Sequence, residues 1–143
     1  MSSAGQQLIA NRIPGERIAT TVATSNSANV TTEAITDTVV AALVSGRTYK
    51  ISFRCSVTGG AAERALIRIR EDNVSGTVLQ TFRVQITVAT NYGAPPVEAE
   101  YTAVSTGNKT FVATLQRETA VANTFRTGNA TQPVYLYVDY IRG

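Results

Sequence analysis

Histidine and tryptophan are absent from this sequence of 143 residues, and cysteine and methionine each occur once. Without histidine the chain cannot assemble a Ser-His-Asp or Cys-His nucleophile, and a single cysteine excludes an internal disulfide and a His/Cys zinc site. The one thiol, Cys55, falls on the inward parity of an alternating segment, where a small buried hydrophobe is its ordinary role. We therefore expect no cofactor and no metal.

Charged residues are also sparse, at 16% of the chain, with 13 basic and 10 acidic side chains and a net charge of +3. Glu98 and Glu100 share one face of a predicted strand at i, i+2, but that face is expected to meet solvent, where paired surface roles are more common than acid/base catalysis. The glycine pair of "TGGAA" (58–62) lacks the lysine and the helix of a phosphate-binding loop. These absences favour a protein that is not an enzyme.

Long apolar runs are missing as well. No stretch of 18 apolar residues occurs, so the sequence predicts no membrane-spanning helix and no membrane partner. The opening "MSSAGQQLIANRIPGER" lacks the basic and apolar regions of a signal peptide. We expect the protein to be made and folded in the cytoplasm.

What the sequence does contain is 21 threonines, 19 alanines and 16 valines. Threonine and valine are stiff at χ1 and suit a pleated surface, so this composition favours β-structure. Alternating or β-rich segments separated by glycine, proline and asparagine turns lie at 17–24, 32–44, 47–57, 63–71, 77–88, 97–104, 110–118 and 133–143. The apolar run within 32–44 could also be helical, but its threonines and paired valines favour a strand.

About eight short strands with no amphipathic helix predict an all-β fold, an antiparallel, jelly-roll-like β-sandwich. The length is that of one domain. We divide the chain into an extended N-terminal arm over residues 1–15, which carries no pattern, and a β-sandwich domain over residues 16–143.

The closing segment "PVYLYVDYIRG" (133–143) raises the question of function. Its aliphatic parity, Val134, Leu136 and Val138, suits a core, which sends Tyr135 and Tyr137 to the outer face. Tyrosine offers a large apolar ring with a polar tip, so it suits a subunit contact or a platform for stacking a sugar. A third interpretation is that the sandwich buries both faces. We rank the subunit contact first.

A stripe of arginines is the other candidate surface. Arg64, Arg68 and Arg70 line one side of the predicted strand 63–71, but acidic residues flank the stripe and no exposed aromatic is interleaved with it for base stacking. We therefore expect no nucleic-acid partner. Pairing of Arg68 and Arg70 with Glu98 and Glu100, across strands or across subunits, is the better use of these arginines.

Five stretches together carry a resemblance to a known family. They are "PGERIATTVAT", "SGRTYKISFRCSV", "ALIRIRED", "TGNKTFVATLQR" and "PVYLYVDYIRG", and they span roughly residues 14 to 143. In strand order and composition they resemble the small β-sandwich domain of virion structural proteins from tailed phages of actinobacteria. That domain occurs at the ends of minor tail proteins and as short stand-alone virion proteins.

The resemblance implies a non-catalytic protein on the outer surface of the virion, made in the host bacterial cytoplasm and assembled as a symmetric homo-oligomer, often a trimer. Because the arm is short, a capsid decoration protein that binds the major capsid protein is expected before a minor tail or fibre protein. A carbohydrate-binding module that takes a surface glycan is a further alternative. In the first case the arm, with Leu8, Ile9, Arg12 and Ile13, would lie along the capsid or a neighbouring subunit.

Overall fold

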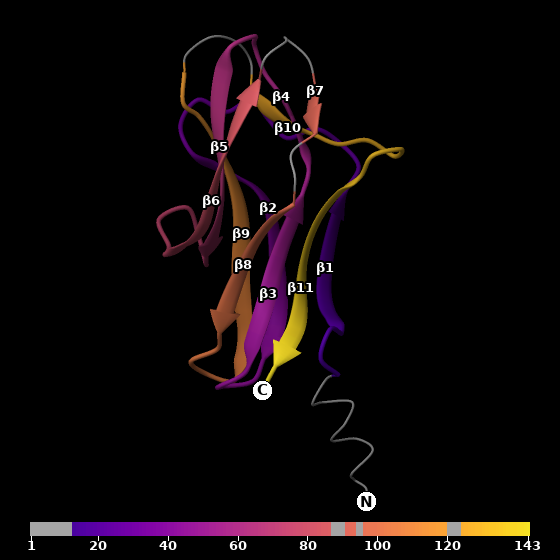
Figure 1. Cartoon of the computed structure of the whole chain (residues 1–143), viewed down its shortest axis with the longest axis vertical. Coiled ribbons are helices and arrows are strands. Elements are labelled where there is room, and N and C mark those ends of the chain that lie inside the picture. Colours follow the sequence, from indigo (N-terminus) through magenta and orange to yellow (C-terminus); the bar gives the residue numbers. More distant parts are fainter. Residues whose placement is uncertain (1–12, 87–90, 94–95, 120–123) are drawn as a thin grey trace, which may run out of the picture.

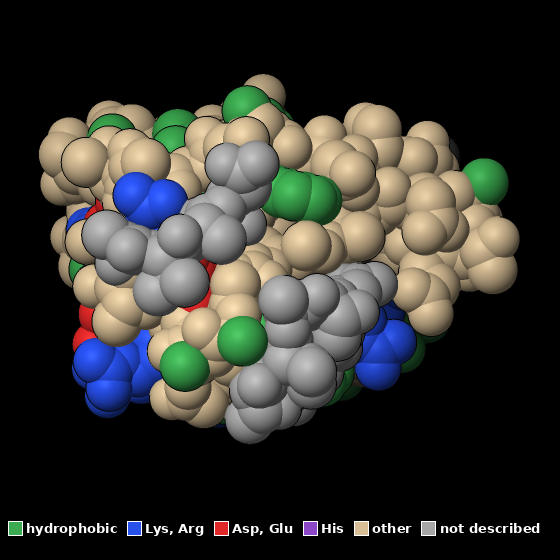
Figure 2. Space-filling view, turned by 90° about the horizontal axis from the view of Figure 1, so that it is seen from above, with side chains coloured by type: hydrophobic (Ala, Val, Ile, Leu, Met, Phe, Trp, Pro, Cys, Tyr) green, Lys and Arg blue, Asp and Glu red, His purple; other side chains and the backbone are tan. Residues whose placement is uncertain are grey.

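The computed structural model describes residues 13–86, 91–93, 96–119 and 124–143, and the remaining residues are drawn in grey in Figures 1 and 2. Every regular element among the described residues is a β-strand. The all-β prediction is therefore confirmed, including the interpretation of 32–44 as a strand. Within the same residues, no helix has the length and apolar character needed to cross a membrane.

Two four-stranded antiparallel sheets pack face to face (Figure 1). Sheet A consists, in order across the sheet, of β1 (Arg17–Ala23), β11 (Val134–Arg142), β3 (Thr48–Arg54) and β8 (Val97–Thr102). Sheet B consists of β2 (Ala34–Leu43), β9 (Gly107–Arg117), β5 (Glu63–Glu71) and β6 (Val78–Ile86). The antiparallel, jelly-roll-like sandwich expected from the sequence is confirmed.

A small third sheet lies at one end of the sandwich (Figure 1). It is made of β10 (Phe125–Thr127), β4 (Ser56–Thr58) and β7 (Asn91–Gly93). The predicted strand 47–57 is in fact two strands, because the chain leaves sheet A after Arg54 and joins the third sheet at Ser56. Three-residue strands are too short to show periodicity, which is why β7 and β10 were not predicted.

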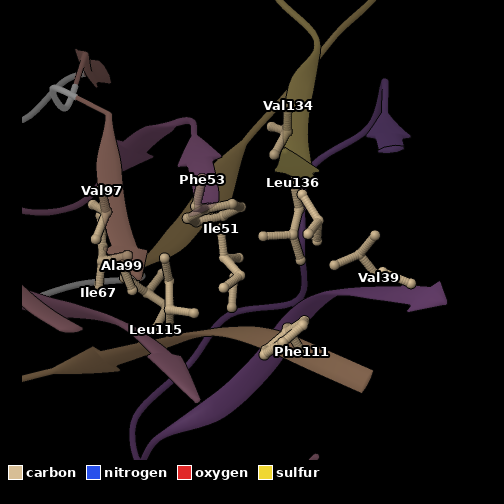
Figure 3. Packing of buried hydrophobic residues seen from close by; sticks show 14 of the residues in the cluster. Val39, Ile51, Phe53, Ile67, Val97, Ala99, Phe111, Leu115, Val134 and Leu136 are labelled. Carbon is tan, nitrogen blue, oxygen red and sulfur yellow. The ribbon is translucent and has the colours of Figure 1, made fainter. Parts of the chain in front are cut away.

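The hydrophobic core fills the space between sheets A and B (Figure 3). Ile51 and Phe53 from β3 and Leu136 from β11 face Phe111 and Leu115 from β9, and all five are buried. Fully burying each such side chain stabilises the fold by about 1.5–3 kcal/mol. The inward-facing residues of the long strands form this core. Candidate binding residues must therefore lie on the outer faces and edges of the sandwich.

The chain enters the sandwich through a turn that is fastened to the last strand. The Gly15 N–H donates to the Tyr140 carbonyl at 2.6 Å, and the Tyr140 N–H donates to the Glu16 carbonyl at 2.9 Å. The start of β1 and the C-terminus therefore lie at the same end of the molecule (Figure 1). The opposite end carries the third sheet.

Candidate functional site

The outer face of sheet A carries the two tyrosines. Strand register sets Tyr135 between Val22 of β1 and Arg54 of β3, so that these three residues form a row across three strands. The next row places Tyr137 between Thr20 and Ser52. The aliphatic residues of β11 lie in the core, as the alternation predicted. Both tyrosines therefore have the predicted outward parity.

Their exposure differs, because the ring of Tyr137 is covered by a residue of its own chain. The guanidinium of Arg17 lies 3.5 Å from the centre of the Tyr137 ring, and the Arg17 Nε donates to Asp139 Oδ1 at 3.1 Å. This cover leaves Tyr137 only 7% exposed. A cation over an aromatic face is a favourable contact, so Tyr137 is engaged within its own chain. Tyr135 remains half-exposed, and a subunit contact through it stays a prediction.

A shallow hollow of about 430 Å³ lies beside Tyr135, where sheet A gives way to the third sheet. It is lined by Arg54, Cys55, Ser56, Pro96, Gln132, Pro133 and Tyr135. Its walls combine one aromatic ring and two prolines with a guanidinium, a hydroxyl and an amide. A concave site with an apolar lining and a few convergent polar groups is the usual form of a small-ligand site.

The thiol in this hollow is not a reactive group. Burial, with a contribution from the charge of Asp37, raises the pKa of Cys55 to about 12. Cys55 packs partly against the core, in keeping with its predicted role as a small hydrophobe. At neutral pH it is a neutral thiol, which is a poor nucleophile.

The arginine stripe is used inside the chain. Arg70 donates to Glu33 through its Nε at 2.6 Å and its Nη2 at 2.8 Å, and Arg68 reaches the same carboxylate at 3.1 Å. Thr114 donates a further hydrogen bond to Glu33 at 2.6 Å. This Glu33 cluster joins the start of β2 to β5 and β9 across the outer face of sheet B. The sequence offered no signal for it, because Glu33 lies 35 residues before Arg68.

The predicted pairing of Arg68 and Arg70 with Glu98 and Glu100 within one chain is therefore wrong. These arginines lie on the outer face of sheet B, whereas the two glutamates lie on the outer face of sheet A, with the core between them. Glu98 instead pairs with Lys50 at 3.6 Å and Glu100 with Arg142 at 3.0 Å. A pairing between subunits stays a prediction.

A buried ion pair was likewise not predicted from the sequence. Arg126 of β10 donates to the Asp37 carboxylate at 2.9 Å and 3.2 Å, and the two side chains are 5% and 4% exposed. Arg126 also donates to the carbonyl of Ser25. The pair connects the third sheet to β2. Because both side chains are buried, we assign the pair a role in stabilising the fold and not in binding a ligand. No group of three or more potential metal ligands occurs among the described residues.

The side of the sandwich formed by β1 and β2, the β1/β2 side, is the least charged. Thr21 of β1 donates to the Thr38 carbonyl of β2 at 2.7 Å, so the two edge strands lie close together. Arg17, at the start of β1, is paired with Asp139, and between residues 18 and 46 only Glu33 and Asp37 are charged, both in the internal ion pairs described above. Large apolar side chains are nevertheless exposed there, Val22 at 51%, Ile35 at 43% and Val40 at 53%.

Figure 2 looks down on the end of the molecule that carries the third sheet. Most of the visible basic and acidic side chains lie at the left of this view, one basic group lies to the right of centre, and the right end shows mostly backbone and uncharged side chains. Of the predicted arm contacts, Leu8, Ile9 and Arg12 lie outside the described residues. Ile13 is described and exposed.

Comparison with known proteins reveals only distant structural likeness. No protein-family model matches the sequence, and no curated protein matches it. A structure from the disulfide-linked pili of Bacillus endospore appendages is 16% identical over 92% of this chain and 96% of its own, with a TM-score of 0.44.

Two further structures are similar at the same level. Clostridium thermocellum xylanase 10B, determined as its CBM22-1 and GH10 modules with xylohexaose, is 16% identical over 85% of this chain and 25% of its own, with a TM-score of 0.45. A structure of the Gx strain of infectious bursal disease virus is 11% identical over 90% of this chain and 39% of its own, with a TM-score of 0.40. At this identity the likeness concerns the fold alone.

Proposed function

We propose that this protein is a non-catalytic structural component of a phage virion, a capsid decoration protein that binds the outer surface of the assembled head. It acts by adhering as a folded unit, in self-contact and in contact with the major capsid protein. The resemblance of the five sequence stretches to virion domains of actinobacterial phages supports this location, and the surface of the sandwich offers a physical means of binding.

The observation that carries this proposal is the β1/β2 side. Exposing Val22, Ile35 and Val40 to water is unfavourable, and covering them with a partner recovers part of that free energy. Charged residues are depleted at the centres of protein interfaces, as they are on this side. The two acids of residues 18–46 are neutralised internally, so a partner surface meets no uncompensated charge there.

Stabilisation of a shell follows from mass action. A protein that binds assembled capsid subunits, and not free ones, shifts the equilibrium toward the assembled shell. This needs buried contact area and many copies, and it needs no chemical reaction. In this proposal the N-terminal arm adds contacts along the capsid or a neighbouring subunit, and the protein carries no binding site for nucleic acid.

The location is tested by counting copies on purified particles. The decoration proposal expects the protein in many copies on heads that lack tails, at regular lattice positions in electron cryomicroscopy. A minor tail or fibre protein, the alternative within the same class, is expected in few copies and only on tailed particles. Absence from tailless heads contradicts the decoration proposal.

A second candidate function, the binding of a surface glycan, is favoured by one specific observation. The hollow beside Tyr135 presents a half-exposed aromatic ring next to polar side chains, on a face that the core does not use. An aromatic ring with nearby hydrogen-bonding groups suits a sugar, which has an apolar C–H face and polar hydroxyls. Tyr137 does not contribute to such a platform, because Arg17 covers it.

A further inference from the structure

Arg54 differs from the other basic residues that the structure describes. It is the one basic side chain among them with no ion pair, side-chain hydrogen bond or cation-aromatic contact, and it is exposed at the end of β3. Arg64, for comparison, pairs with Glu118 and Arg17 with Asp139. An unpaired guanidinium on a protein in which the other described cations are engaged is available to a ligand.

The surroundings of Arg54 restrict what that ligand is. It lines the hollow beside Tyr135 and Gln132, and none of the lining residues is acidic. No carboxylate of the hollow therefore competes for the guanidinium. A planar guanidinium binds carboxylates through two parallel hydrogen bonds, which gives both affinity and orientation. These features favour an anionic ligand, for which a carboxylate is a suitable group.

The position of the hollow in sheet A argues against an extended peptide. Arg54 belongs to β3 and Tyr135 to β11, and both strands are interior strands with a hydrogen-bonded neighbour on each side. A peptide that adds as a strand needs a free sheet edge, which neither strand offers. Recognition in this hollow must come from side chains, as it does for saccharides.

We propose that the hollow binds an acidic sugar, a uronate unit of a surface polysaccharide. Arg54 binds its carboxylate, the Tyr135 ring stacks against the C–H face of the pyranose, and the Gln132 amide hydrogen-bonds to adjacent hydroxyls. This proposal rests on the glycan-binding candidate and makes it specific by naming the class of sugar. It does not depend on attachment of the protein to heads.

The test is a calorimetric titration of the full chain with tetragalacturonate and with its fully methyl-esterified form. The ester retains the sugar but removes the charge, so its affinity is expected to be lower. A hydrogen bond to a charged group contributes about 1.5–3 kcal/mol, so the loss should be roughly ten- to a hundredfold. Arg54→Gln is expected to lose as much affinity for tetragalacturonate, and Arg54→Lys to lose less. Tyr135→Ala should weaken both ligands.

Arg142→Gln is the matched control, because Arg142 is an exposed arginine of the same sheet at the opposite end of the molecule and is paired with Glu100. It should leave the titration unchanged. Equal affinity for the ester, or an Arg54→Gln variant that binds as the wild type does, overturns the acidic-sugar proposal while leaving neutral glycan binding standing. Equal affinity for tetraglutamate overturns the saccharide assignment. Binding of neither sugar ligand refutes the hollow as a glycan site and leaves the decoration proposal to its own test.

Discussion

At the scale of single residues, most side chains with reactive or charged groups contribute to the packing of the fold. Cys55 is held neutral by burial, Asp37 is enclosed with Arg126, and Tyr137 lies under Arg17. In each case a side chain that looks functional in the sequence is engaged inside the chain. Tyr135 and Arg54 are the exceptions, since the first is half-exposed and the second has no side-chain partner in the part of the chain that the structure describes.

The buried Arg126–Asp37 pair gives a prediction at this scale. Arg126→Met leaves a buried carboxylate without its counter-ion, and breaking such a pair typically costs about 3–5 kcal/mol. The double variant Asp37→Leu with Arg126→Met should recover much of that loss, because neither buried charge remains. Urea denaturation monitored by circular dichroism measures both. Arg142→Met, which breaks an exposed pair, should change the free energy of unfolding by less than about 1 kcal/mol.

If Arg126→Met is as stable as the wild type, the pair does not fasten the third sheet. The recovery in the double variant is the more specific result. It separates the cost of an unpaired charge from the cost of altered packing.

At the scale of elements, the strands are joined through side chains that no local pattern reveals. The Glu33 cluster ties the start of β2 to β5 and β9, and Arg126 ties β10 to β2. The edge strands β1 and β2 lie close through the bond from Thr21 to Thr38. Sheet edges are sites of unwanted pairing. Register irregularities in both β1 and β2 disturb the regular spacing that such pairing needs.

The Glu33 cluster predicts how stability depends on pH. Burial acts to raise the pKa of Glu33, but hydrogen bonds from Arg70 and Thr114 and the charges of Arg68 and Arg70 outweigh it and hold that pKa below its ordinary value of 4.5. The folded state therefore binds the proton more weakly than the unfolded state. The stabilisation is present above about pH 4.5 and is lost as the pH falls through the folded pKa.

The measurement compares unfolding of the wild type and of Glu33→Gln from pH 7 to pH 3. The variant should be less stable at neutral pH, and the difference between the two should shrink as the pH falls, because the wild-type carboxylate becomes protonated. Taking the difference removes the effect of the other acids. A difference that is constant with pH contradicts an ionised Glu33 as the source of the stabilisation. Glu98→Gln, on an exposed pair, should give a small difference throughout.

At the scale of the whole molecule, the distribution of charge divides the sandwich. The β1/β2 side carries exposed valine and isoleucine, and its charged residues, Arg17, Glu33 and Asp37, are all paired within the chain, whereas exposed ion pairs such as those of Arg83 and Lys50 lie elsewhere. A surface whose few charges are paired within the chain can meet a copy of itself with little repulsion between like charges. This side, and not the Tyr137 region, is therefore our expectation for self-contact, with the symmetry of the assembly, three-fold or otherwise, to be measured.

The prediction at this scale uses exposed valines. Val22→Glu and Val40→Glu each introduce a charge on the β1/β2 side and are expected to dissociate the proposed homo-oligomer into folded monomers, since burying an unpaired charge is costly. Sedimentation velocity over a range of concentrations provides the measurement. Val78→Glu is the matched control, because Val78 is 42% exposed at the start of β6, which is the edge of sheet B opposite to β2, the strand of Val40.

A wild type that sediments as a monomer at all concentrations contradicts the self-contact. So does dissociation by Val78→Glu with no effect of the other two substitutions, which would move the contact to the opposite side. Either result leaves binding to assembled heads as a separate question for the particle measurements.

Local sequence was sufficient to predict the strands and their inward faces. The alternation in 63–71 and 133–143 depends on a two-residue period that neighbouring residues reveal by themselves, so Ile67 and Leu136 could be assigned to the core before any partner strand was known. The absence of histidine and the single cysteine likewise restricted the chemistry from composition alone. The strands β7 and β10 could not be predicted in this way, because three residues are too few to show the two-residue alternation.

Contacts between distant segments were decided only in the tertiary structure. Arg70 has Glu33 as its partner, and not Glu98, because strand order places Arg70 and Glu33 on one outer face and Glu98 on the other. Parity assigns a side chain to the inner or outer face of its strand, but it contains no information about which strand lies alongside. The strand order and the packing of the two sheets decide which strands are neighbours. They also decide whether an outward-facing residue is covered, as Tyr137 is, or exposed to a ligand, as Arg54 is.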